Sequence, residues 1–176
     1  MRKAEEKFSI VLLRNLAGAL AIVWMCVIFA FSAQTKEESG AVSESFSYRM
    51  VSSTKFFFHW DMSDERVREI ADAIEGMVRK AAHMAEYGIL SVLLYIWIGQ
   101  WEMSFLRRGG TAVGATAVYA ATDEFHQLFV AGRSGRISDV CIDSAGALAG
   151  VVVFVLLAKF VKYVRAKRER RGERNM

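Results

Sequence analysis

The apolar residues of this chain are gathered into long blocks, and most of its charge lies between those blocks. The first block, about residues 12–31, contains the run LAGALAIVWMCVIFAF. A helix needs about 20 apolar residues to cross a bilayer, and three further blocks, about 81–101, 111–130 and 137–161, are also long enough. A soluble domain would instead spread its apolar residues in short periodic runs. The pattern predicts an all-α membrane protein with four transmembrane helices.

The composition agrees with that prediction. Of the 176 residues, 53% are hydrophobic and none is proline, so proline kinks are excluded. Cys26 and Cys141 both lie inside apolar blocks, which excludes a disulfide framework or a Cys-rich zinc site. No internal repeat or low-complexity linker divides the chain, so residues 1–176 are expected to form a single domain. We expect membrane lipids, and not nucleic acid, as partners.

The first block could also be read as a signal peptide, because a basic start precedes it and AFSA resembles a cleavage site. Its apolar stretch exceeds the 7–15 residues of a typical signal core. Glu5 and Glu6 also interrupt the basic start. An uncleaved transmembrane helix is therefore the favoured interpretation.

A further helix is expected before the second span, over about residues 63–78. This segment is too charged to cross a membrane, but its apolar residues recur at helical spacing. Those residues are Val67, Ile70, Ile74, Met77 and Val78. The segment is predicted to be an amphipathic helix on the membrane surface. The alternative is a solvated helix packed on the preceding loop.

The basic residues predict how the protein is oriented. With four spans, both termini and the loop after the second span share one side, which holds 14 of the 23 Lys and Arg residues. Because basic residues accumulate on cytoplasmic segments, we expect both termini, including the basic tail 162–176, in the cytoplasm. Residues 34–78 and 131–136 would then face outward from a multi-pass protein of the plasma membrane.

Polar side chains occur inside three of the predicted spans, at the ends that an up-down arrangement brings to the outer side. Arg79, His83 and Glu86 follow one another at intervals of four and three residues, which places them on one helix face. The candidate catalytic residues are His83, Glu86, Asp123, Glu124, His126, Asp139 and Asp143. The candidate substrate-binding residues are Ser32, Gln34, Arg79, Tyr87, Gln127, Arg133 and Arg136.

Two interpretations of this polar set are open. A charge at the centre of a spanning helix costs about 2.5–3.5 kcal/mol on insertion scales, so ionisable residues in spans predict a functional pocket. Alternatively, the same side chains only bond neighbouring helices to each other. Singly, Arg79 could be an interfacial anchor, Tyr87 part of an aromatic belt, and Ser32 and Gln34 caps of the first span.

The residue types allow chemistry on a phosphate group. His83 or His126 could act as general base, oriented by Glu86 or Asp123, because the unperturbed pKa of histidine is about 6.5.

Anion and cation binding are the other possibilities at the outer side. Arg133 and Arg136 could hold a phosphate bidentately. Asp139 and Asp143 could hold a divalent cation against it, although their spacing names no particular ion.

Three segments together resemble the VanZ-like family of small bacterial membrane proteins: FSAQ, RKAAHMAEYG and TDEFHQLFVAGRSGRISDVCIDSAGALAG. The resemblance covers about residues 10–160. Ala131 departs from it, since members of the family usually have proline before the Gly-Arg pair. The resemblance implies a cell-envelope role, related to low-level teicoplanin resistance, at a site that acts on lipid head groups or lipid-linked envelope precursors.

Three functions stay open: an enzyme acting at a lipid site, a non-catalytic envelope binding or accessory protein, and a transporter. A transporter needs polar groups that continue to the inner face. The inner parts of the last three spans are apolar, with the runs ILSVLLYIWIG, AVGATAV and GVVVFVLLA. That pattern disfavours a transport path through one subunit.

The predicted orientation can be tested with reporters fused to each terminus. A reporter that is active only outside the cytoplasm should be inactive at both ends, because both ends are expected inside. Activity of such a reporter at either terminus would contradict the predicted topology.

Overall fold

The chain is described by a computed structural model over residues 2–173, and all its regular elements are helices. The all-α prediction is confirmed. The five helices are α1 (Arg2–Ser32), α2 (Lys36–Phe57), α3 (Asp64–Ile98), α4 (Phe105–Gln127) and α5 (Ile137–Glu173).

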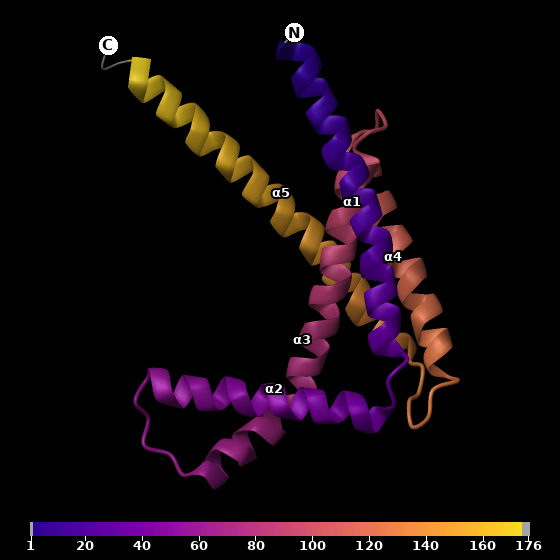
Figure 1. Cartoon of the computed structure of the whole chain (residues 1–176), viewed down its shortest axis with the longest axis vertical. Helices are drawn as coiled ribbons and strands as arrows, with labels where there is room; N and C mark the ends of the chain where they lie inside the picture. Colours follow the sequence, from indigo (N-terminus) through magenta and orange to yellow (C-terminus); the bar gives the residue numbers. More distant parts are fainter. Residues whose placement is uncertain (1, 174–176) are drawn as a thin grey trace.

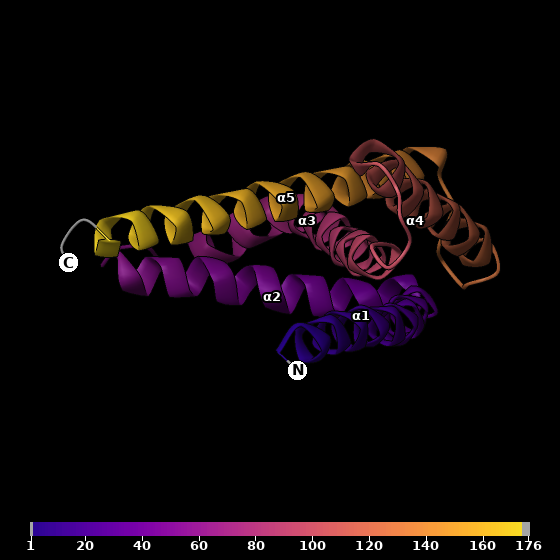
Figure 2. The ribbon, with the colours of Figure 1, turned by 90° about the horizontal axis from the view of Figure 1, so that it is seen from above.

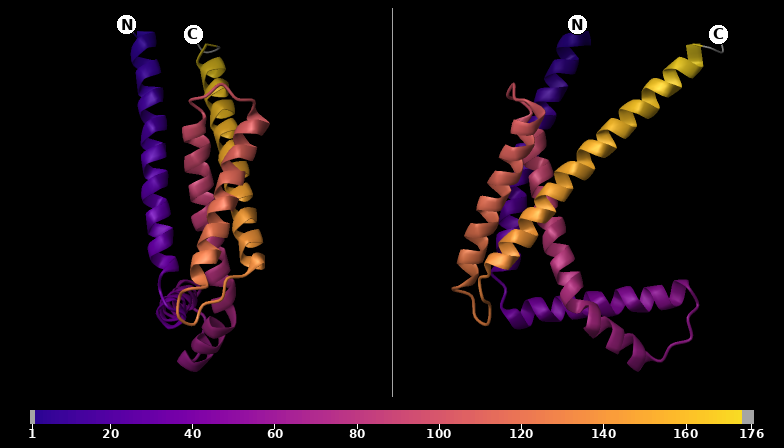
Figure 3. Two further views of the ribbon diagram at one scale, coloured as in Figure 1. Left: turned by 90° about the vertical axis from the view of Figure 1, so that its right-hand side faces the viewer. Right: turned by 180° about the vertical axis from the view of Figure 1, so that it is seen from behind.

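Four helices run lengthwise in alternating directions, and α2 lies across their lower end (Figure 1). Both chain ends lie at the opposite, upper end, as the two views of Figure 3 show. Helix α5 leans away from the others toward its C-terminus (Figure 1). Viewed from above, α2 and α5 extend to the same side, past α1 and α4 (Figure 2).

Three of the described helices are long and apolar enough to cross a membrane: Lys7–Ser32, Asp64–Ile98 and Ile137–Arg168. The prediction of four spans is therefore not confirmed in full. Helix α4 packs against α1, α3 and α5, but its length holds two arginines, two acidic residues and many small residues in place of large apolar ones. Its apolar content is accordingly the lowest of the four lengthwise helices.

Helix α3 joins two elements that the sequence pattern separates. Residues 64–78 of the amphipathic segment and residues 81–98 of the predicted span 81–101 lie in one unbroken helix of 35 residues, which ends at Ile98. The hydroxyl of Ser63 caps its start by accepting a hydrogen bond from the Arg66 N–H at 3.2 Å. The residues between the two segments are good helix formers, so nothing interrupts the helix there.

Two other boundaries differ from prediction. Helix α4 begins at Phe105 and not at 111, because Ser104 caps it, and it ends at Gln127 before a turn over 128–130. Helix α5 continues through most of the basic tail to Glu173. The last residues of that tail, 174–176, lie outside the described residues.

Helix α2 was not predicted, since the segment after the first span reads as a loop by hydrophobicity. It starts at a capping box, in which the Thr35 N–H donates to Glu38 at 2.9 Å and the Glu38 N–H donates to the Thr35 hydroxyl at 3.3 Å. The Thr35 N–H and the Thr35 hydroxyl both donate to the Glu38 carboxylate, and these two hydrogen bonds lower the pKa of Glu38. The helix is held against α3 by a small cluster around Val51, Val67 and Ala71.

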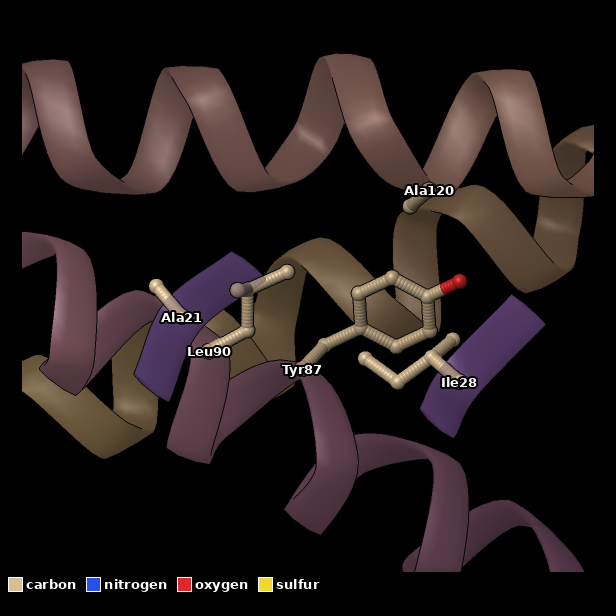
Figure 4. Packing of buried hydrophobic residues seen from close by; sticks show 5 residues of the cluster. All are labelled: Ala21, Ile28, Tyr87, Leu90 and Ala120. Carbon is tan, nitrogen blue, oxygen red and sulfur yellow. The ribbon is translucent and has the colours of Figure 1, made fainter. Parts of the chain in front are cut away.

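The main core lies where α1, α3 and α4 meet. Figure 4 shows its five buried side chains, Ala21, Ile28, Tyr87, Leu90 and Ala120. Ile28 and Ala120 lie on either side of the Tyr87 ring, and Ala21 lies next to Leu90. Two of the five are alanines, which lets the helices approach closely around one large aromatic side chain. Tyr87 is therefore a core residue as well as a candidate site residue.

Helices α3 and α5 cross at close range because glycines line their contact. A Cβ added at Gly150 would lie 2.6 Å from the Gly88 carbonyl oxygen. One added at Gly146 would lie 2.6 Å from the Met84 Cα. Such distances are shorter than any ordinary van der Waals contact, so larger residues would force the two helices apart.

We predict that Gly150→Ala destabilises the protein by about 1–3 kcal/mol, the usual cost of overpacking. This loss should outweigh the gain of about 1 kcal/mol that alanine has over glycine in a helix. Gly114→Ala is the matched control, because nothing lies within 4 Å of its added Cβ. Reversible unfolding in mixed detergent micelles measures both variants, and equal stabilities would contradict the close crossing.

Candidate functional site

A cavity of about 320 Å³ opens at the lower end of the lengthwise helices, near the beginnings of α2 and α5 and the end of α4. Charged and polar groups dominate its lining. Its ionisable residues are Lys36, Arg79, Lys80, His83, Glu124, Arg133, Arg136, Asp139 and Asp143. Five of these are Lys or Arg and three are carboxylates, so the cavity carries a surplus of positive charge.

The turn between α4 and α5 closes one wall of the cavity. Glu124, at the end of α4, accepts a hydrogen bond from the backbone N–H of Arg136 at 2.8 Å. Gly132 has a φ of +73°, a conformation that a side chain would strain. The Ala131 carbonyl accepts from the Lys36 N–H at 3.4 Å, which ties the turn to α2.

Arg133 fastens the same turn to the end of α1. Its Nε donates to the Gln34 carbonyl at 2.9 Å, and a terminal nitrogen donates to the Phe31 carbonyl at 3.4 Å. Carbonyls at a helix C-terminus lack partners within the helix, so an arginine there is well placed to satisfy them. Arg133 is thus held in place by the backbone while it lines the cavity.

A buried hydrogen-bonded group lies next to the cavity. The Tyr87 hydroxyl donates to Asp123 at 3.0 Å, and the Gln127 amide donates to the same carboxylate oxygen at 3.3 Å. Gln127 also lines the cavity, whereas Asp123 and Tyr87 do not. The second oxygen of Asp123 has no hydrogen-bond partner within the described part of the chain. A buried carboxylate is costly unless it is bonded, so Tyr87 and Gln127 stabilise it.

The two candidate histidines occupy different surroundings. His83 lines the cavity, and its Nδ1 lies 3.7 Å from a carboxylate oxygen of Glu86. The ring of His126 instead packs against Phe29 with centroids 4.4 Å apart. His126 does not line the cavity, and its Nδ1 is buried with no partner among the described residues. His83 is the histidine that can reach a bound molecule.

The structure brings together part of the predicted site. Eight candidates line the cavity: Arg79, His83, Glu124, Gln127, Arg133, Arg136, Asp139 and Asp143. Six candidates do not line it: Ser32, Gln34, Glu86, Tyr87, Asp123 and His126. Of the latter, Ser32 is buried and Gln34 contributes its backbone carbonyl to Arg133. The cavity therefore holds only part of the candidate set.

Several lining residues were not among the candidates. Lys36 and Ser39 belong to α2, and Lys80, Ser134 and Ser138 also face the cavity. The first two depend on a helix that hydrophobicity does not reveal. The Thr35–Glu38 capping box is a sequence signal that would have found it.

The aspartates gain no further metal ligands from the fold. Within residues 2–173, no group of three or more His, Cys, Asp or Glu side chains is arranged to hold a metal ion. Asp139 and Asp143 stand in the cavity as carboxylates among basic residues.

A family model described as VanZ/LLP1 matches residues 18–158 of the chain. No curated protein and no solved structure gave a match. The matched range contains α2, α3 and α4, parts of α1 and α5, and every residue that lines the cavity. The chain has apolar helices of membrane-spanning length, and the family model matches most of its residues. It is therefore a membrane protein that belongs to the VanZ/LLP1 family.

Proposed function

We propose that this VanZ-like protein acts in the cell envelope, where its cavity binds the anionic head group of a membrane lipid or a lipid-linked envelope precursor. One observation carries the proposal: five Lys and Arg side chains surround a single cavity at the end of the apolar helices. Lys and Arg in such numbers favour a phosphate-bearing ligand.

The position of the cavity supports a lipid as the source of that phosphate. The end of α1 and the start of α5 lie at the same end of the molecule (Figure 3). The cavity is lined by residues from the start of α5. The ends of membrane-spanning helices reach the head-group layers of a bilayer. A cavity at that depth is open to head groups that diffuse within the membrane. The distribution of Lys and Arg supports placing this end on the outer side.

The basic residues are not equivalent. Arg133 already bonds two backbone carbonyls, so part of its role is to hold the turn between α4 and α5. The side chain of Arg136 lines the cavity while its backbone N–H bonds Glu124. Arg79 lies 3.5 Å from Glu75, an ion pair that a phosphate could replace. Arg79 and Arg136 are therefore the residues we assign to the phosphate.

The carboxylates limit which head groups fit. Asp143 is buried, and Asp139 is half-buried beside it on the same helix face. Carboxylates accept hydrogen bonds from hydroxyl, amine or ammonium groups. A head group that combines a phosphate with such a donor would satisfy both the basic and the acidic part of the lining.

Turnover of the bound head group is a second candidate function, favoured by the His83–Glu86 pair. Glu86 can orient the His83 ring through Nδ1, which leaves Nε2 to take a proton from water. Attack of that water on the phosphate would form a new P–O bond and break the ester bond to the leaving alcohol. The proton on His83 would then pass to the leaving oxygen.

A binding experiment tests the first proposal. The purified chain in detergent should bind short-chain phosphatidic acid, and Arg136→Gln should weaken that binding roughly 10- to 100-fold. This range corresponds to one charge-assisted hydrogen bond of about 1.5–3 kcal/mol. Isothermal titration calorimetry measures the affinity, and an uncharged short-chain diacylglycerol serves as the ligand without phosphate.

Arg66→Gln is the matched control variant. It removes the same charge, but the Arg66 side chain is exposed and pairs with Glu69 at 2.7 Å away from the cavity. The proposal fails if both variants bind phosphatidic acid equally well.

Turnover is tested separately in liposomes that contain candidate phospholipids and polyprenyl-phosphate precursors. Mass spectrometry should detect a product with the unmodified protein and none with the His83→Gln variant. The amount of protein in the membrane should be the same for both. His59→Asn is the control, since His59 lies in the α2–α3 connection with a positive φ that asparagine tolerates. If the protein binds a lipid tightly but forms no product from any of the lipids, it is a binding protein and the enzymatic function is excluded.

A further inference from the structure

Helix α2 carries an apolar stripe that no other part of the described chain covers. Val42, Phe46, Met50 and Phe57 expose 62%, 58%, 40% and 74% of their surface. Successive residues of a helix are about 100° apart, so these four side chains fall within a sector of about 80°. These four side chains define an apolar stripe along α2, which the exposed Ser53 interrupts between Met50 and Phe57.

This stripe differs from the face by which α2 packs on α3. Ser47 is fully buried and Val51 nearly so, and Val51 contacts the cluster of Val67 and Ala71. Ser47 and Val51 lie about 115° around the helix from the centre of the stripe. The packing against α3 is therefore complete without the stripe, which needs another apolar partner.

The direction of α2 points to a membrane surface as that partner. Its axis lies across the lengthwise helices, at the end where α1 stops (Figure 1, Figure 3). Residues 33–35 alone connect the apolar helix α1 to α2. Helix α2 therefore starts at the depth where the chain leaves the apolar layer, and it runs parallel to the bilayer plane.

An aromatic cluster marks the far end of α2. Phe56, Phe58 and Trp60 are all exposed, and the rings of Phe58 and Trp60 stack with centroids 5.4 Å apart. Aromatic side chains concentrate at membrane–water interfaces, where an apolar ring and a polar edge are both satisfied. The cluster extends the apolar stripe to the tip of the α2–α3 hairpin.

The distribution of charge indicates which helix of the hairpin faces the lipids. Residues 36–60 hold three acidic and three basic residues, whereas residues 61–76 hold six acidic and two basic ones. Anionic lipids give membranes a negative surface potential that repels carboxylates. Helix α2 suits the lipid side, and the acidic start of α3 suits the aqueous side.

We propose that α2 is an interfacial helix whose stripe, Val42, Phe46, Met50 and Phe57, lies in the bilayer at the boundary of head groups and acyl chains. The partner is the lipid surface itself. In this position α2 holds Lys36 and Ser39 at the mouth of the cavity. The inference does not depend on what the cavity binds.

Spin labels at single cysteines test the proposal on the full chain in phosphatidylcholine–phosphatidylglycerol vesicles. The two native cysteines are first removed as Cys26→Ala and Cys141→Ala. A nitroxide is then attached at Phe46→Cys or Met50→Cys on the stripe, or at the control position Glu44→Cys. Glu44 is exposed and lies on nearly the opposite side of the helix from Phe46. These exposed positions leave the buried contacts intact.

Collisions with oxygen, which concentrates in lipid, and with a water-soluble nickel chelate report the depth of each label. Labels at positions 46 and 50 should collide more with oxygen, and the label at position 44 more with nickel. Equal nickel accessibility at positions 44 and 46 would overturn the proposal. A second copy of the chain could instead cover the stripe. The labels would then be protected from both reagents, and their spin–spin broadening would vanish on dilution with unlabelled protein. That result would also overturn the proposal.

Discussion

The close crossing of α3 and α5 is the contact on which the rest of the structure depends. Helix α3 touches every other helix, and it meets α5 where Gly88, Gly146 and Gly150 leave almost no space between the backbones. In a membrane, where burial of apolar surface gains little, such backbone proximity is a main source of helix association. The same crossing sets the first turns of α5 beside α3, and that placement brings Asp139 and Asp143 to the same cavity as His83.

Polar side chains link this helical core to the site. Tyr87 fills the centre of the main cluster, and its hydroxyl reaches Asp123. Through Gln127 the same hydrogen-bonded group borders the cavity. Glu124 and Arg133 hold the turn between α4 and α5 by hydrogen bonds to backbone groups. The functional-pocket and helix-bonding interpretations are thus not exclusive, because Asp123 bonds α3 through Tyr87 while Glu124 and Gln127 line the cavity.

Sequence reasoning predicted the features that follow from long-range hydrophobicity and local spacing. The lengthwise helices and the gathering of Arg79, His83, Asp139 and Asp143 at one end are of this kind. It missed α2, which is stabilised by a capping box and by contacts with α3 and contains too few apolar residues to stand out by hydrophobicity. It also could not separate His126 from His83, since the packing of Phe29 on His126 is set by a distant helix. The spacing of residues along one helix shows which of them share a face of that helix. Which other helix packs on that face depends on the whole fold.

The central claim is that the cavity lies at head-group depth and receives an anionic head group. Photo-cross-linking with two phospholipid probes tests it most directly, one with the reactive group in the head and one at the end of an acyl chain. The head-group probe should form adducts mainly within residues 79–83 and 132–143, which include most of the cavity lining. The acyl-chain probe should label the exposed apolar surface of α1 and α5 instead. The claim would be contradicted if the head-group probe formed adducts only at the opposite end, at residues 99–104. It would also be contradicted if both probes gave the same pattern of adducts.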